Sequence, residues 1–157
     1  MGTPSAVDPA GLGSEAMTAA LLDAGRVETP AGHAALLLLA ESDFSGTAAM
    51  TRYVRLYDET DPATGAPMLS AYADWGRLLE DLSELRLSGS DIKLLRLAAS
   101  YGIGTPVDLS TCAGLTPVYA KAAAVAALVA AGASEVLALD LIMGTEQGAA
   151  LWGQVPD

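Results

Sequence analysis

The chain is poor in the side chains that carry most enzyme chemistry. Its 157 residues include one histidine, His33, and one cysteine, Cys112, which excludes an intrachain disulfide, a multi-cysteine metal site and a multi-histidine metal site. No nucleophile motif accompanies His33, so a helix-surface or core position is favoured over catalysis. No basic residue adjoins Cys112, which favours a buried, inert thiol. We therefore expect no catalytic residue, no metal ligand and no cofactor-binding residue.

Positive charge is also scarce. Only 8 residues are Lys or Arg against 19 Asp or Glu, so the net charge is −11 and the isoelectric point is about 4.2. Such a field repels the phosphates of nucleic acids and the anionic surface of a membrane. We read the acidic balance as a contribution to solubility, and expect neither nucleic acid nor a membrane as a partner.

From the sequence we expect neither a secretory leader nor a membrane-spanning segment. Residues 1–13 contain no Lys or Arg and no apolar core, unlike a signal peptide. The most continuous apolar run, residues 122–133, is rich in alanine and shorter than the ~20 residues that span a bilayer. These features favour a cytoplasmic location.

Apolar residues, by contrast, are abundant. They make up 52% of the chain, mean hydropathy is +0.37, and 31 residues are alanine, the strongest helix former. The sequence therefore predicts an all-α fold, a compact bundle of six to eight short helices. We expect a flexible N-terminal tail over residues 1–13 and a single all-helical domain over residues 14–157.

Helix start and stop signals recur along this domain. Thr29 supplies a capping hydroxyl and Pro30 a residue suited to the first helical position, so a helix is predicted from here to about Glu41. Its run Leu36–Leu39 is apolar on all sides, which places this helix at the centre of the fold. Other predicted helices span residues 14–25, Ser42 or Ser45 through Glu59, 68–82, Ser88 or Ser90 to Gly102, 105–114 and 116–132.

The end of the chain is open to two interpretations. Residues 136–143 suit either a buried helix capped by Ser134 or a short buried strand, because periodicity cannot separate the two in so short a run. Beyond them, Thr145 is suited to cap one last turn that carries Leu151 and Trp152.

One apolar stripe stands out in the predicted helix 68–82. Its members recur alternately four and three residues apart and would share one helix face: Met68, Tyr72, Trp75, Leu79 and Leu82. The stripe holds two of the few aromatic side chains, which contribute strongly to interfaces. It either packs inside the monomer or forms the contact with a protein partner or a second copy.

Residues 91–132 contain a second pattern, of helix, short helix, turn at Gly114 and longer helix. Residues 94–98, 106–117 and 122–132 resemble the helix-turn-helix core of winged-helix proteins. The resemblance implies a recognition helix over residues 116–132 and the start of a wing over residues 136–143. The only polar side chains with which this helix could contact DNA bases are Tyr119 and Lys121, whereas base readout needs Arg, Asn or Gln. A purely structural three-helix unit is therefore favoured.

Together these features favour a small, acidic, non-enzymatic protein that acts in protein–protein interaction or assembly. The abundance of apolar residues leaves room for an exposed contact surface. Two alternatives stay open. One is a DNA-associated regulator built on residues 91–132. The other is an enzyme with a site of scattered carboxylates. Asp58, Glu59 and Asp61 have a spacing that could hold Ca²⁺ or Mg²⁺, but they lack the EF-hand pattern and are most simply solvated loop charge.

The charge balance predicts that the protein does not bind duplex DNA appreciably near physiological salt. The negative net charge opposes association with DNA. Residues 91–132, which resemble a helix-turn-helix core, supply few side chains for specific contacts. A fluorescence-anisotropy titration measures this directly. Sub-micromolar affinity that persists at roughly 150 mM salt would contradict the prediction.

Overall fold

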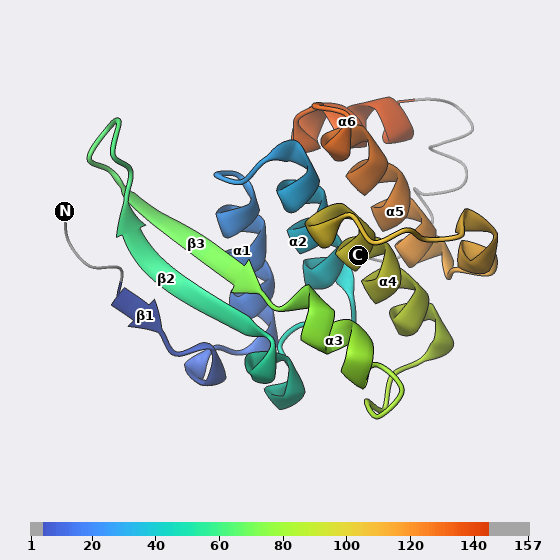
Figure 1. Ribbon diagram of the computed structural model, residues 1–157. Helices are drawn as coiled ribbons and strands as arrows, with labels where there is room; N and C mark the ends of the chain where they lie inside the picture. The colour runs from blue at the N-terminus through green and yellow to red at the C-terminus, as the bar shows by residue number, and fades with distance from the viewer. Residues whose placement is uncertain (1–4, 145–157) are drawn as a thin grey trace.

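The computed structural model describes residues 5–144, in which a body of α-helices carries a small antiparallel sheet along one side (Figure 1). This mixed α/β architecture corrects the all-α prediction. The strands pair in the order β1-β2-β3, and their bounds are β1 (Ser5–Val7), β2 (Val54–Thr60) and β3 (Pro67–Ala73). The predicted last turn with Leu151 and Trp152 lies outside the described residues.

All of the described helices except α3 begin and end close to the predicted signals. The helices are α1 (Ser14–Gly25), α2 (Pro30–Glu41), α3 (Trp75–Asp81), α4 (Gly89–Ile103), α5 (Pro117–Ala130) and α6 (Glu135–Met143). Side-chain oxygens of Thr29, Ser88 and Ser134 accept backbone N–H groups in the first turns of α2, α4 and α6. Residues 136–143 are thus helical and do not form the alternative short strand. The start of a wing, which the winged-helix resemblance implies at these residues, is not found there.

Short 3-10 turns connect these elements. They are η1 (Pro9–Gly11), η2 (Ala48–Arg52) and η3 (Leu109–Cys112). The segment 105–114, predicted as a short helix, contains only η3. Residues 5–13, assigned to a flexible tail by sequence, contain β1 and η1, and β1 pairs with the middle of β2.

The helix predicted from Ser42 or Ser45 through Glu59 is wrong: residues 48–60 form η2 and strand β2 instead. Both a helical spacing and the two-residue alternation of a strand are present in this stretch. Only the two-residue alternation agrees with the structure. Val54 and Leu56 are buried while Arg55, between them, is exposed, which is the alternation of a strand covered on one face. Val54 is β-branched and Tyr57 aromatic, types that favour strands.

The helix predicted over residues 68–82 is also wrong: it divides into strand β3 and helix α3. Pairing with β2 fixes β3, with Arg55 opposite Tyr72 and Leu56 opposite Ala71. Asp61 shapes the connecting turn, where its carboxylate accepts the Ala63 N–H at 2.8 Å and the Thr64 hydroxyl at 2.7 Å. Helix α3 then begins after Asp74, whose side chain accepts the Arg77 N–H.

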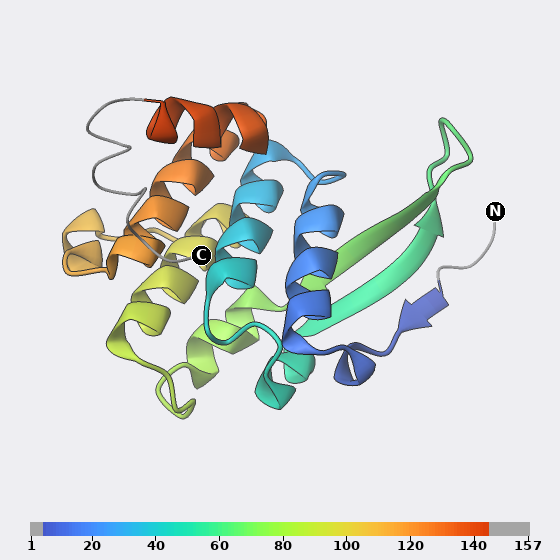
Figure 2. The same cartoon turned by 180° about the vertical axis from the view of Figure 1, so that it is seen from behind.

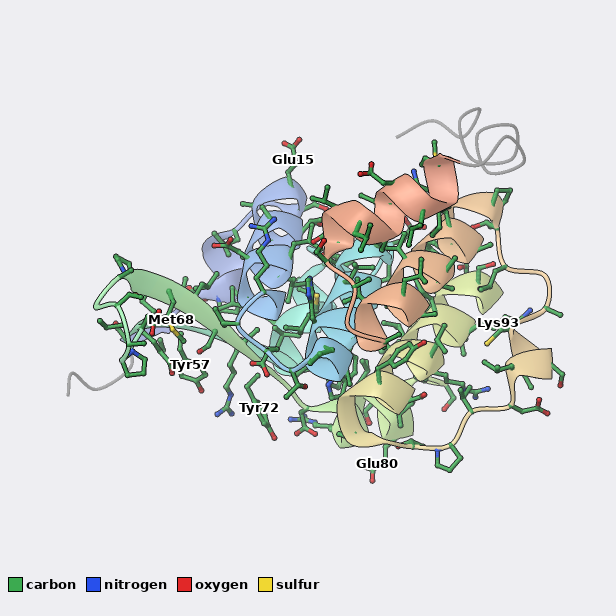
Figure 3. All side chains as sticks on the ribbon, turned by 90° about the horizontal axis from the view of Figure 1, so that it is seen from above. Glu15, Tyr57, Met68, Tyr72, Glu80 and Lys93 are labelled. Atoms are coloured by element: carbon green, nitrogen blue, oxygen red, sulfur yellow. The ribbon has the colours of Figure 1, made fainter. Side chains whose placement is uncertain are left out.

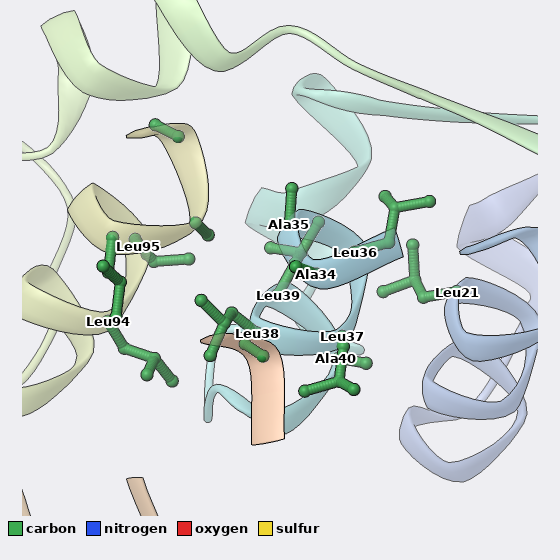
Figure 4. Close-up of a cluster of buried hydrophobic side chains, with 14 of the residues drawn as sticks. Leu21, Ala34, Ala35, Leu36, Leu37, Leu38, Leu39, Ala40, Leu94 and Leu95 are labelled. Atoms are coloured by element: carbon green, nitrogen blue, oxygen red, sulfur yellow. The ribbon is translucent and has the colours of Figure 1, made fainter. Parts of the chain in front are cut away.

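Helix α2 lies at the centre of the core, as its apolar sequence predicts. All seven residues from Ala34 to Ala40 are buried. Figure 4 shows Leu38 directed toward Leu94 of α4 on one side and Leu36 toward Leu21 of α1 on the other. Helix α5 also packs against α2, and Figure 2 shows this layer of helices from behind.

A buried polar cluster joins three segments around α2. Asp91, at the start of α4, accepts hydrogen bonds from the hydroxyls of Tyr119 (2.5 Å) and Ser88 (2.6 Å) and from the Asp43 N–H (3.1 Å). Burial, followed by the hydrogen bond to Asp91, raises the pKa of Tyr119 above its usual range. Because Tyr119 is enclosed here, it is not available as the base reader that the helix-turn-helix resemblance implies.

Truncating a side chain of α2 tests this arrangement. Leu38 is fully buried, so Leu38→Ala leaves a cavity and should lower the free energy of unfolding by about 2–5 kcal/mol. Urea unfolding followed by circular dichroism measures the change. The matched control is Leu109→Ala on η3, where the leucine is 70% exposed and the expected change is within about 0.5 kcal/mol. Equal losses in both variants would contradict the central position of α2.

Candidate functional site

No helix lies over one face of the β2–β3 ribbon, on which Arg55 and Tyr72 are exposed and the other side chains half-buried. The residues that share it are Arg55, Tyr57 and Glu59 of β2 and Met68, Ser70 and Tyr72 of β3, here called the open sheet face. The opposite face turns Val54, Leu56, Leu69, Ala71 and Ala73 toward the core. Figure 3 shows Tyr57, Met68 and Tyr72 directed away from the helical body, and in Figure 1 no helix lies in front of the ribbon.

A pocket of about 330 Å³ lies at the base of this face, where β3 ends and α3 begins. It is called the Tyr72 pocket below. Its other walls come from the start of α2 and the end of α4. It is lined by Glu28, Gly32, Ala35, Leu36, Ala71, Tyr72, Ala73, Asp74, Trp75, Gly76, Gly102 and Ile103. Three segments that are distant in sequence therefore form one small concave site.

Two aromatic residues stand at opposite extremes of exposure in this pocket. Tyr72 is 58% exposed, whereas Trp75 is only 6% exposed. The Trp75 indole lies against the backbone of Gly102: a Cβ added there would be 2.3 Å from the indole Nε1. Glycine is thus required for this close approach. Among the described residues we find no hydrogen-bond acceptor for the Trp75 Nε1.

The polar walls of the pocket are acidic. Glu28 folds toward Gly32, with its Oε2 3.4 Å from the position of a Cβ on that glycine. Asp74 is half-buried and retains one carboxylate oxygen, Oδ2, beyond the Oδ1 that caps α3. The lining residues include no Lys or Arg. The pocket therefore combines two carboxylates, two aromatic rings and short apolar side chains.

A buried tyrosine holds α3, and with it Trp75, against the sheet. The Tyr53 hydroxyl donates to the Asp81 carboxylate at 2.8 Å, and the Arg77 guanidinium lies 5.8 Å from the centre of the Tyr53 ring. Arg77 also approaches Asp81, at 3.9 Å. Both ends of α3 are thus tied down, since Asp74 caps its start. These contacts hold the helix that begins with Trp75 against the sheet.

The structure divides the predicted interface stripe between surface and core. Met68 and Tyr72 lie on the open sheet face, and Tyr72 and Trp75 line the same pocket. Leu82 is buried and Leu79 half-buried within the helical body. The pocket residues of α2 and α4 were not foreseen, because no local pattern connects them to β3.

A second pocket, of about 400 Å³, lies between α2 and α6. His33 Nε2 is 3.5 Å from Glu135 Oε2 and is a buried atom without a hydrogen bond among the described residues. The two residues form an ion pair only when His33 is protonated. Sequence reasoning considered His33 but had no signal for Glu135, which belongs to a different helix.

Helix α6 carries another exposed apolar surface. Val136, Leu137 and Leu141 are about half exposed or more, and Ala138 is its one buried residue. This surface is apolar but has no aromatic side chain and no concave site beyond the His33 pocket. The α6 surface is therefore a second candidate docking surface, but it has fewer polar and aromatic groups that could select a particular ligand.

The remaining candidate residues are placed apart from both pockets. Asp58 and Glu59 lie near the end of β2, and Asp61 is occupied in the hairpin turn. Cys112 is half-buried in η3. Within residues 5–144, no three His, Cys, Asp or Glu side chains gather closely enough to hold a metal ion.

Comparison of the chain with protein-family models, with curated proteins and with solved structures finds no match. None of the helices in the described part of the chain has the length and apolar character needed to cross a membrane.

The contact between Gly102 and Trp75 gives a test of the pocket. Gly102→Ala should displace the indole and lower the free energy of unfolding by about 1–3 kcal/mol, because a methyl group cannot fit beside Nε1. The control is Gly76→Ala in α3, where the nearest atom is 3.9 Å away and alanine should leave stability equal or higher. Urea unfolding compares the two. A stable Gly102→Ala variant would contradict the described contact.

Proposed function

We propose that this protein is a non-enzymatic interaction domain that binds a protein partner through the open sheet face and the Tyr72 pocket. The observation that carries the proposal is Tyr72 itself. Its ring is 58% exposed, and it stands where a sheet face with no helix over it meets a pocket with a buried tryptophan wall. An exposed aromatic ring beside a preformed pocket is the arrangement found at energetic centres of interfaces.

The sheet face suits a macromolecular partner because it is extended and mixed in chemistry. Met68, Tyr57 and Tyr72 offer apolar area, while Arg55 and Glu59 offer charges of both signs. Interfaces of non-obligate complexes combine apolar and polar groups in this way. Tyrosine and methionine are among the residues enriched at such surfaces.

A partner of different sequence is favoured over a second copy. Two molecules that each carry a net charge of −11 repel one another at low salt. In addition, the carboxylates of the Tyr72 pocket would face an equally acidic surface. A partner with a complementary, positively charged surface would instead be attracted.

Photocrosslinking tests the position of the interface. A benzophenone amino acid at position 72, introduced in cells that produce the protein, should yield a discrete cross-linked species. The same group at position 109, an exposed site on η3 at the opposite end of the molecule from the ribbon (Figure 2), should not. A species of twice the monomer mass would mean a second copy and would contradict a heterologous partner.

Affinity for the captured partner provides the quantitative prediction. Tyr72→Ala should weaken binding about 10- to 30-fold, since a central aromatic residue contributes about 2 kcal/mol. The melting temperature should stay unchanged, because Tyr72 is largely exposed. Leu109→Ala is the matched control and should bind as the wild type does. Isothermal titration calorimetry measures both, and equal affinities of the two variants would disprove the proposed interface.

A further inference from the structure

The Tyr72 pocket has a chemical bias that narrows the kind of partner. From it we infer that the pocket receives a cationic side chain, Lys or Arg, from the bound polypeptide. The inference rests on the proposed function, since it names the group that the same site recognises. Three independent features carry it: the charge of the walls, the aromatic rings and the engagement elsewhere of two of the chain's three nearby cations.

The walls present negative charge without a compensating cation. Glu28 and Asp74 both line the pocket, and no Lys or Arg does. Carboxylates in a concave site attract a cation more strongly than they do on a flat surface, because the low-dielectric walls focus the field. The net charge of −11 on the whole chain also attracts a cation, over a longer range.

Two of the three basic side chains near the pocket are already engaged, and the third lies outside its lining. Arg26, two residues before Glu28, pairs with Asp23 at 3.0 Å. Arg77, next to Gly76, lies over the Tyr53 ring and approaches Asp81. Arg55 stands opposite Tyr72 on the open sheet face and is not part of the pocket lining. The negative charge inside the pocket is thus left for a ligand.

The aromatic and apolar walls suit the rest of such a side chain. Tyr72 and Trp75 can hold a cation by the attraction between positive charge and an aromatic ring. Ala35, Ala71 and Ala73 provide a short apolar wall for its methylene stem. The Trp75 Nε1, which has no acceptor among the described residues, is a donor for a carbonyl of the same polypeptide.

The test is a nuclear magnetic resonance titration of the full chain, with the indole N–H signal of Trp75 as the readout. Trp152→Phe identifies that signal, because the chain has only two tryptophans. The probe is the blocked peptide Gly-Thr-Arg-Thr-Gly, and its neutral control carries citrulline in place of arginine. The arginine peptide should shift the Trp75 signal in a saturable way, with the citrulline peptide about three- to tenfold weaker.

Charge variants of the pocket complete the test. Glu28→Gln combined with Asp74→Asn should weaken the arginine peptide about three- to tenfold, and asparagine preserves the cap of α3. Glu15→Gln removes a carboxylate from the exposed start of α1, away from the pocket (Figure 3), and should change nothing. The inference would be overturned if the citrulline peptide bound as tightly as the arginine peptide, or if the double variant bound the arginine peptide as the wild type does. It would also be overturned if ethylguanidinium alone bound as tightly as the peptide.

The outcomes separate this inference from the proposed function. If position 72 cross-links a partner and Tyr72→Ala weakens it, but the charge variants bind normally, the interface stands and the cationic side chain is wrong. If the arginine peptide binds but Tyr72→Ala leaves partner affinity unchanged, the pocket recognises a cation while the proposed interface is wrong.

Discussion

The fold is organised by a helix that must be covered on every side. Seven consecutive residues of α2 are buried, so water has to be excluded from its whole circumference. Helices α1, α4 and α5 contact it directly, and the inner face of the β2–β3 ribbon extends the same core. Once these elements are in place, no helix in residues 5–144 covers the outer face of the ribbon. The exposed site is thus a consequence of how the core is completed.

Local signals allowed the sequence to predict α2, α4 and α5 but not the sheet. A cap such as Thr29-Pro30 acts within one helical turn, so it can be read without knowing the rest of the fold. Strand pairing depends on residues that meet only after folding, such as Arg55 and Tyr72. In residues 50–57 the helical spacing and the strand alternation were both present, and long-range pairing decided between them.

The candidate site was predicted in part, through an incorrect structure. Tyr72 and Trp75 were selected because helical spacing would place two of the few aromatic residues on one face, and both do line one pocket. The helix that was expected to join them is instead a strand followed by a helix, which exposes Tyr72 and buries Trp75. Gly102 gave no signal of its role, because a glycine late in a helix is compatible with an ordinary helix end.

The most direct test of the interaction surface is hydrogen–deuterium exchange of the protein with and without its captured partner. Backbone amides report which element is covered, independently of any substitution. If the open sheet face is the interface, exchange should slow in β2 and β3 and in the first turn of α3, while η3 is unaffected. Slowing confined to α6, where Val136, Leu137 and Leu141 form the second candidate docking surface, would contradict the account.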